Sequence, residues 1–148
     1  MKVFHRGRLA GALSVLLAGA AVPAFSETTV RIGHVLADSH SWHIAAQGFA
    51  KDVADKTAGE VKVEIFPGGQ LGAEKDVIEG LQFGSVQGGI IGAGSFQAVE
   101  PKLGIIEMPY AWPTREKAFA ALDGELGSAL GGLLEEKGIK VLAWWENG

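Results

Sequence analysis

Residues 30–66, VRIGHVLADSHSWHIAAQGFAKDVADKTAGEVKVEIF, decide the fold. Apolar and polar residues alternate at 30–33 and again at 61–65, which is the period of a half-buried strand. Between these two segments, apolar residues recur every three or four positions, as on one face of a helix; they are Trp42, Ala45, Ala46, Phe49, Ala50 and Val53. The stretch is therefore predicted to form a strand, a helix and a strand, with Asp38 or Ser39 as the helix N-cap.

The same alternation of elements continues along the chain. Residues 74–83 have a helical pattern, and residues 86–91 read as a strand interrupted by glycine. Residues 114–122 and 126–134 are predicted to be two further helices, and residues 139–145 a buried returning strand. Strands that alternate with helices favour an α/β fold with a mainly parallel sheet, whose ligand site lies beyond the carboxyl ends of the strands.

The N-terminus has the pattern of an export signal. Three basic residues precede an apolar run at residues 9–22, and small residues follow at Ala24 and Ser26. We predict that residues 1–26 are a signal peptide cleaved after Ser26. The run of about 14 apolar residues is short for a membrane span, which needs roughly 20, so an uncleaved anchor is the less favoured alternative.

Charge and composition exclude several classes of function. Removing residues 1–26 takes away three of the 13 basic residues and none of the 17 acidic ones, which leaves a net charge of about −7. This charge disfavours a nucleic-acid partner. The chain has no cysteine, which excludes thiol catalysis and Cys-based metal sites. No nucleophile motif is present either, so the sequence does not indicate an enzyme and predicts no cofactor.

Three histidines near the end of the first strand suggest one alternative function. His34, His40 and His43 could act together as imidazole ligands in a periplasmic metal-binding protein. No glutamate lies between His40 and His43 to complete a metalloprotease helix motif. Histidines at the start of a helix also act as caps or polar contacts, and we favour that interpretation over a metal site.

Other candidate site residues have two interpretations each. Residues 92–95, Gly-Ala-Gly-Ser, either present backbone amides to a small ligand or form a simple tight turn, and they lack the third glycine of a dinucleotide motif. Glu74 is either a ligand contact or a carboxylate favoured by the helix dipole. Trp112, Trp144 and Trp145 either wall a cleft or belong to the core.

Seven short motifs follow one another along the chain: IGHVL at 32–36, HSWH at 40–43, FA at 49–50, IFP at 65–67, QLG at 70–72, EGL at 79–81 and WENG at 145–148. Their order and spacing resemble the DctP family of periplasmic receptors of TRAP transporters. The resemblance implies the first lobe of a two-lobed, periplasmic-binding-protein-like fold. It makes residues 27–148 an N-terminal lobe that is truncated at its C-terminus; such a fragment alone would expose apolar surface and sheet edges.

The resemblance also implies a function. A receptor of this family captures a small organic acid, here expected to be a carboxylate, in the periplasm and delivers it to the small and large TRAP permease subunits. Its ligand-binding residues in this chain would be His34, Val35, Glu74, Gly92, Ala93, Gly94, Trp145 and Asn147. The arginine pair that binds the ligand carboxylate is expected beyond Gly148. Ser41 and Gln87 stand where the family commonly has Pro and Asp, which leaves the identity of the acid open, as is the oligomeric state.

Overall fold

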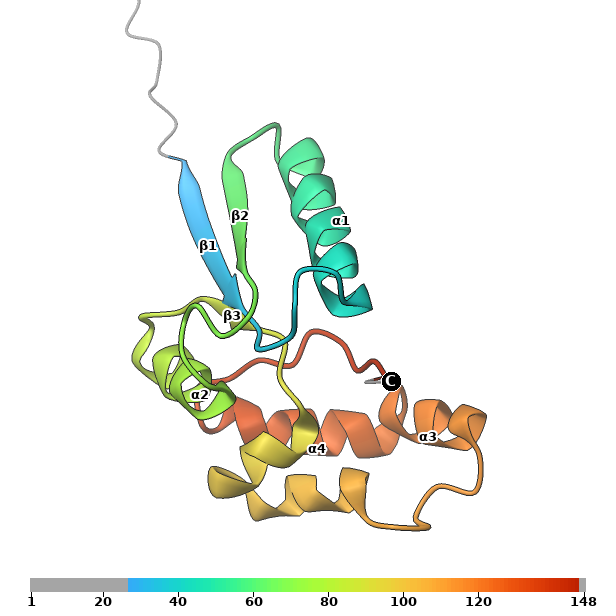
Figure 1. Ribbon diagram of the computed structural model, residues 1–148. Coiled ribbons are helices and arrows are strands. Elements are labelled where there is room, and N and C mark those ends of the chain that lie inside the picture. Colours follow the sequence, from blue (N-terminus) through green and yellow to red (C-terminus); the bar gives the residue numbers. More distant parts are fainter. Residues whose placement is uncertain (1–26, 147–148) are drawn as a thin grey trace, which may run out of the picture.

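The computed structural model describes residues 27–146 and has an α/β fold (Figure 1). A three-stranded parallel sheet has the strand order β2-β1-β3, as the alternation of strands and helices predicted. The predicted signal peptide at residues 1–26 and the predicted site residue Asn147 lie outside the described residues. Within residues 27–146, no helix combines the length and the apolar character that a membrane crossing requires.

The first unit is the predicted strand, helix and strand. β1 (Thr28–Gly33) pairs with β2 (Val61–Phe66) in parallel, and α1 (Ser41–Lys56) connects them. Trp42 and Ala46 of α1 are buried against the sheet, where they pack with Ile90. The buried face is narrower than the periodicity predicted, because Phe49 is 46% exposed. This unit holds one end of the candidate site in place.

The N-cap of α1 is His40, so the prediction of Asp38 or Ser39 was wrong. His40 has an extended backbone, and its Nδ1 accepts a hydrogen bond from the backbone amide of Trp42 at 3.2 Å. A neutral imidazole nitrogen supplies the acceptor that a Ser or Asp oxygen usually gives at this position.

α2 (Glu74–Phe83) lies where predicted and ends at Gly84, which has a left-handed backbone (φ 74°). The strand predicted at 86–91 shrinks to β3 (Gly88–Gly89). A Cβ at Gly88 would lie 2.8 Å from Cγ1 of Ile32, so only glycine allows the backbone to approach β1 this closely. Beyond the strand, the chain winds into two 3-10 helices, η1 (Ala93–Ala98) and η2 (Pro101–Glu107).

The C-terminal half is helical. α3 (Arg115–Leu122) and α4 (Glu125–Glu135) confirm the two helices predicted there. A second core lies between α2, η2 and α4, and its buried members are Ile78, Leu103, Leu130, Leu134 and Ile139.

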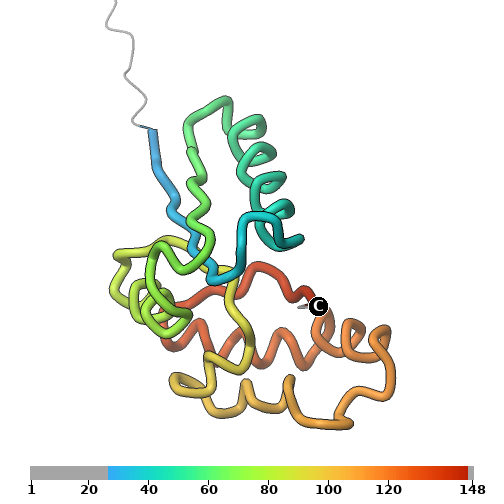
Figure 2. Tube along the Cα trace, viewed as in Figure 1, coloured from blue at the N-terminus to red at the C-terminus, as the bar shows by residue number. Residues whose placement is uncertain are grey.

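The strand predicted at 139–145 is absent from the described residues. The segment 139–146 has no regular secondary structure, and it passes between α4 and the sheet (Figure 2). Ile139 is buried, and Val141 and Trp144 pack against the second core, whereas Leu142 is 84% exposed. The apolar residues of this segment therefore pack near α4 without forming a strand. A strand also needs a hydrogen-bonded neighbour, and no described strand pairs with this segment.

Candidate functional site

The carboxyl ends of the three strands meet at one edge of the sheet, which we call the carboxyl edge. The amide of His34 donates to the carbonyl of Phe66 at 3.0 Å, and the amide of Gly69 donates to the carbonyl of His34 at 3.0 Å. The amide of Ile90 donates to the carbonyl of Gly33 at 3.0 Å. These bonds bring residues from all three strand ends together, in the place where ligands bind in open parallel sheets.

His34, the first predicted site residue, is buried at this edge with 2% of its surface exposed. Its Nε2 lies 3.1 Å from Nδ1 of His43, and Nε2 of His43 lies 3.3 Å from the side-chain nitrogen of Gln47. One of the two facing ring nitrogens donates a hydrogen bond to the other, and the tautomer of each ring decides which one donates. Nδ1 of His34 is buried and has no hydrogen-bond partner among the described residues.

The surroundings of His34 favour its neutral form. Burial lowers its pKa below the usual imidazole value, and repulsion from His43 and then His40 acts in the same direction. The backbone of Leu36 acts in the opposite direction and raises the pKa of His34. His34 is therefore suited to neutral polar contact and not to pairing with an anion.

The three histidines do not form a metal site. Nδ1 of His40 caps α1, while His34 and His43 bond to each other. Among residues 27–146, no group of three or more His, Asp or Glu side chains is arranged to hold a metal ion. The geometry thus does not favour the metal-binding alternative.

Glu74, the second predicted site residue, connects α2 to the turn that follows β3. Its Oε1 accepts a hydrogen bond from the amide of Gly92 at 3.0 Å, and its Oε2 accepts one from the hydroxyl of Ser95. Asp76 serves the start of the helix instead, since its Oδ2 accepts from the amide of Ala73 at 2.8 Å. The carboxylate of Glu74 therefore orders the 92–95 turn.

The backbone amides of this turn bind the protein's own carboxylates. The amide of Gly92 donates to Glu74, and the amide of Gly94 donates to Oε1 of Glu107 at 2.7 Å. Ala93 lies between them, half-buried, at the start of η1. The residues form a short turn followed by 3-10 helix, with two amides already directed at carboxylate oxygens.

Trp145 lies on a different segment but contacts α1. Its ring centroid is 6.4 Å from that of Trp42, and half of its surface is exposed. The indole nitrogen of Trp42 donates to the carbonyl of Glu146 at 3.0 Å. Val35 is also partly open to solvent, with 37% exposed. Among the predicted ligand-binding residues that the structure describes, Glu74 and Gly92 are hydrogen-bonded to each other. His34 and Trp145 each contact a residue of α1 instead.

Trp42 and Glu107 were missed as residues of this region. His43 was considered only as a metal ligand, and Ser95 only as part of the 92–95 turn. Trp42 lies within the HSWH motif, so its neighbourhood could be identified from the sequence. Glu107 gave no signal, because its contact with Gly94 depends on how η1 and η2 pack.

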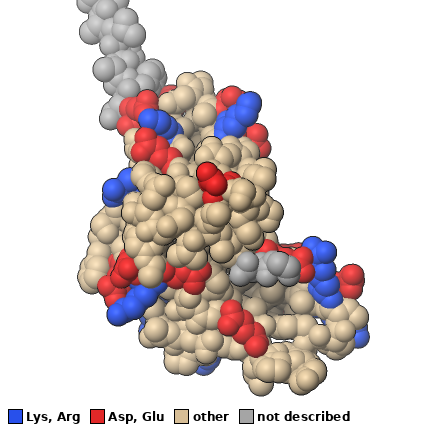
Figure 3. Space-filling model, in the orientation of Figure 1, with Lys and Arg blue, Asp and Glu red and all other residues tan. Residues whose placement is uncertain are grey.

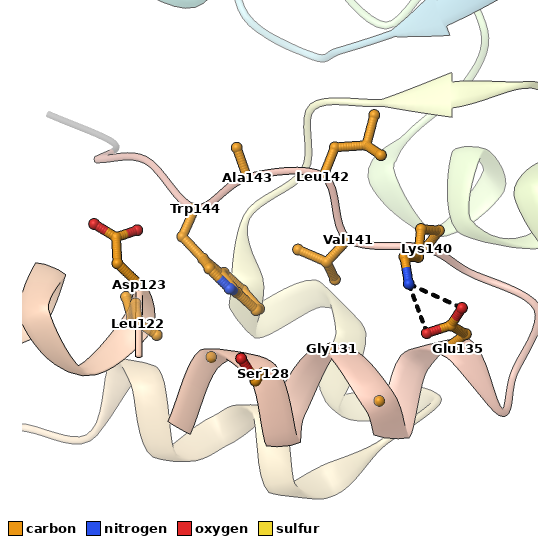
Figure 4. A pocket seen from close by; sticks show the side chains of 12 residues that line it. Leu122, Asp123, Ser128, Gly131, Glu135, Lys140, Val141, Leu142, Ala143 and Trp144 are labelled. Atoms are coloured by element: carbon orange, nitrogen blue, oxygen red, sulfur yellow. Dashed lines mark hydrogen bonds and ion pairs between the residues drawn. The ribbon is translucent and has the colours of Figure 1, made fainter. Parts of the chain in front are cut away.

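Two surface hollows lie away from these residues. One, of about 470 Å³, lies between α4 and residues 140–144 (Figure 4), where Lys140 pairs with Glu135 at 2.8 Å. The other, of about 760 Å³, lies between η2 and α4. Trp144, one of the tryptophans expected either to wall a cleft or to belong to the core, lines the first hollow and also packs against the second core. Neither hollow contains a residue predicted to bind the ligand. Figure 3 shows acidic and basic groups side by side at the margin of one face, with further acidic groups inside it and uncharged surface between them. We retain the carboxyl edge as the candidate site, because the polar side chains and backbone amides gather there.

The sequence is similar to those of known solute-binding proteins. Residues 32–148 match the family of bacterial extracellular solute-binding proteins, family 7. The chain is 33% identical, over 89% of its length, to the 2,3-diketo-L-gulonate-binding periplasmic protein of Escherichia coli, and covers 40% of that protein. It is 34% identical, over 96% of its length, to the C4-dicarboxylate-binding periplasmic protein of Rhodobacter capsulatus, and covers 43% of it. The chain thus spans about two-fifths of the length of these relatives.

Solved structures of solute-binding proteins also resemble this chain. A TRAP periplasmic solute-binding protein from a Sulfitobacter species, with bound β-D-galacturonate, superposes with a TM-score of 0.77 at 30% identity, covering 80% of this chain and 39% of that one. The sugar-acid-binding protein of Advenella mimigardefordensis, in complex with galactonate, gives a TM-score of 0.80 at 30% identity, covering 83% and 40%.

Proposed function

Because the chain belongs to the DctP family of bacterial extracellular solute-binding proteins, we propose that it forms the N-terminal lobe of a TRAP-type receptor that captures a small organic acid. The family is one of solute-binding receptors, not of enzymes. The observation that carries the proposal is the match over residues 32–148, and the carboxyl edge adds a place for the ligand.

The relatives indicate the class of ligand. Those compared above bind a diketo sugar acid, C4-dicarboxylates, galacturonate and galactonate. A carboxylate is common to all of them, and most also carry several hydroxyl groups. We propose a small carboxylic acid, with a sugar acid as the first class to examine.

The roles of the candidate residues follow from their contacts. We propose that His34 and Val35 line the pocket at the end of β1 and that residues 92–94 line it beyond β3. Glu74 would act indirectly, because both of its carboxylate oxygens already bond to the turn. Trp145 and Asn147 would contribute from the segment that crosses towards a second lobe.

Charge pairing with the ligand would come from elsewhere in the receptor. Nη2 of Arg115 already forms an ion pair with Oε2 of Glu146, the last described residue, at 2.5 Å. We propose that the ligand carboxylate is paired by arginines in the part of the receptor that the relatives have and this chain does not span.

Residues 1–26 would direct export and be removed, which places residues 27–148 in the periplasm, where the compared relatives act. The liganded receptor would then dock on the membrane permease subunits of the transporter. Two lobes closing on a ligand would give these subunits a surface to recognise.

A binding screen tests this function. The full gene product is titrated by calorimetry with D-galacturonate, galactonate, L-gulonate and succinate, with galactose as a neutral control. Saturable binding of an acid, without binding of galactose, is expected. NMR of the recovered acid should show it chemically unchanged. A full gene product that binds none of the acids, or converts one of them, would contradict the proposal.

A further inference from the structure

Glu146 is held from two sides, by residues that lie far away in the sequence. Its backbone carbonyl accepts the hydrogen bond from the indole nitrogen of Trp42, in the first turn of α1, at 3.0 Å. Its side-chain Oε2 lies 2.5 Å from Nη2 of Arg115, the first residue of α3. α1 and α3 approach the end of the described chain from different directions (Figure 1). The two contacts therefore restrain both the backbone position of Glu146 and the orientation of its side chain.

Each partner is itself positioned by the fold. Trp42 is only 6% exposed and packs with Ala46 and Ile90, so its indole nitrogen has little freedom to move. The guanidinium of Arg115 lies 5.5 Å from the centre of the Phe119 ring, one turn along α3. These contacts direct both groups to Glu146.

The carboxylate of Glu116 lies near the same guanidinium. The pKa of Glu116 is lowered by its own backbone amide, by the Thr114 hydroxyl and, to a smaller extent, by Arg115. The ion pair of Arg115 within 4 Å is with Glu146. The hydroxyl of Thr114 also accepts from the amide of Lys117 at 3.3 Å, which fixes the first turn of the helix.

The residue before Glu146 is held by the same arrangement. The ring of Trp145 lies 6.4 Å from that of Trp42, while half of its surface stays exposed. Trp145 is a predicted ligand-binding residue. The position of Glu146 therefore helps to set where the ring of Trp145 lies beside α1.

We propose that Glu146 is a positioning residue for ligand capture, held by Trp42 and Arg115 so that Trp145 stays beside the first turn of α1. The inference rests on the proposed receptor function, and it adds three residues that act through their neighbours. Arg115 and Glu146 are 66% and 41% exposed at their side chains, so their pairing contributes little stability but restricts direction.

The test uses four variants of the full gene product. Trp42→Phe removes the indole donor and keeps an aromatic core residue, and Arg115→Ala removes the ion pair from the surface. Arg115→Glu combined with Glu146→Arg restores the pair with exchanged charges. Lys51→Ala is the matched control, because Lys51 forms an ion pair of the same 2.5 Å length with Asp55, on the exposed side of α1.

Two measurements separate positioning from folding. Hydrogen exchange of residues 142–146 is followed without ligand, and affinity is measured by calorimetry with whichever of D-galacturonate, galactonate and succinate binds the parent most tightly. Arg115→Ala and Trp42→Phe should each speed exchange and weaken binding by about two- to tenfold, the range of one net hydrogen bond or ion pair. The charge-exchanged protein should recover most of the affinity, and Lys51→Ala should match the parent.

The outcomes distinguish this inference from the proposed function. A parent that binds none of the acids contradicts the receptor function itself. A parent that binds, together with Arg115→Ala and Trp42→Phe variants that keep its affinity and its exchange rates, overturns the role of Glu146 alone. Weakened binding that the charge exchange fails to recover also overturns it, because Arg115 would then act on something other than Glu146.

Discussion

Nε2 of His34, directly after β1, lies 3.1 Å from Nδ1 of His43, in the first turn of α1. The bond joins the end of a strand to the helix that crosses over the sheet, and it requires one proton between two nitrogens. If both rings were protonated, two N–H groups would face each other at this distance. The pair therefore links the structure of the carboxyl edge to pH.

The free energy of unfolding should fall as the solution becomes acidic. The pKa of His34 is lowered in the folded protein, by burial and then by His43 and His40, so below about pH 6.5 the unfolded chain binds more protons. The contribution of His34 is complete above that pH and is lost as the pH falls towards its folded value. Urea unfolding at pH 8.5, 7.5, 6.5 and 5.5 measures it. A His34→Gln variant should lose less stability than the parent below pH 6.5; equal losses would contradict the prediction.

Replacing Glu74 by alanine should destabilise the protein by about 1–3 kcal/mol. The change leaves the amide of Gly92 and the hydroxyl of Ser95 without their acceptor in a half-buried turn. The control is Glu79→Ala on the same helix, where an exposed pair with Lys75 at 3.7 Å should be worth less than about 0.5 kcal/mol. Urea unfolding compares the two, and similar losses would show that Glu74 does not hold the turn.

Two glycines of α4 should respond in opposite directions to the same substitution. A Cβ at Gly127 would lie 1.7 Å from the carbonyl oxygen of Leu122 and 2.8 Å from the indole nitrogen of Trp144, so Gly127→Ala should cost about 2 kcal/mol or more. Gly132 has nothing within 4 Å of that position, so Gly132→Ala should stabilise by roughly 0.5–1 kcal/mol through helix propensity. Thermal unfolding followed by circular dichroism reads both. A stabilised Gly127→Ala protein would disprove the close contact between α4 and the end of α3.

Leucines separated by eight positions should also differ sharply. Leu134 is 1% exposed in the second core, so Leu134→Ala should cost about 2–5 kcal/mol. Leu142 is 84% exposed, and Leu142→Ala should change stability by less than about 0.5 kcal/mol. A large loss at Leu142 in denaturant unfolding would mean that the segment 139–146 packs differently from the structure.

The parts of the fold that depend on local pattern could be predicted from the sequence. The β1-α1-β2 unit and the helices at 74–83, 115–122 and 125–135 follow from periodicity. The length of β3 and the path of residues 139–146 could not be predicted, since a strand is defined by its neighbour. Their apolar residues fit a strand and an irregular packed segment equally well.

The candidate site was predictable only to the level of its segments. His34, Glu74 and Gly92 were identified, but their actual partners are His43, Ser95 and a carboxylate, set by how distant turns pack. The two readings of Glu74 illustrate the limit. Its place at the start of α2 suggested a dipole effect, whereas its oxygens bond across to a turn about 20 residues later in the chain.

The register of the sheet also has a consequence for the order of folding. β1 pairs with β2 from Thr28 opposite Val61, but it meets β3 only at Ile32 and Gly33, opposite Gly88 and Gly89. The chain between β1 and β3 is longer than the chain between β1 and β2, so bringing β3 to β1 costs more chain entropy. β3 has only two residues whose pairing can offset that cost. β1, α1 and β2 should therefore form the folding nucleus, and β3 should dock afterwards, with the 92–95 turn acquiring its shape last.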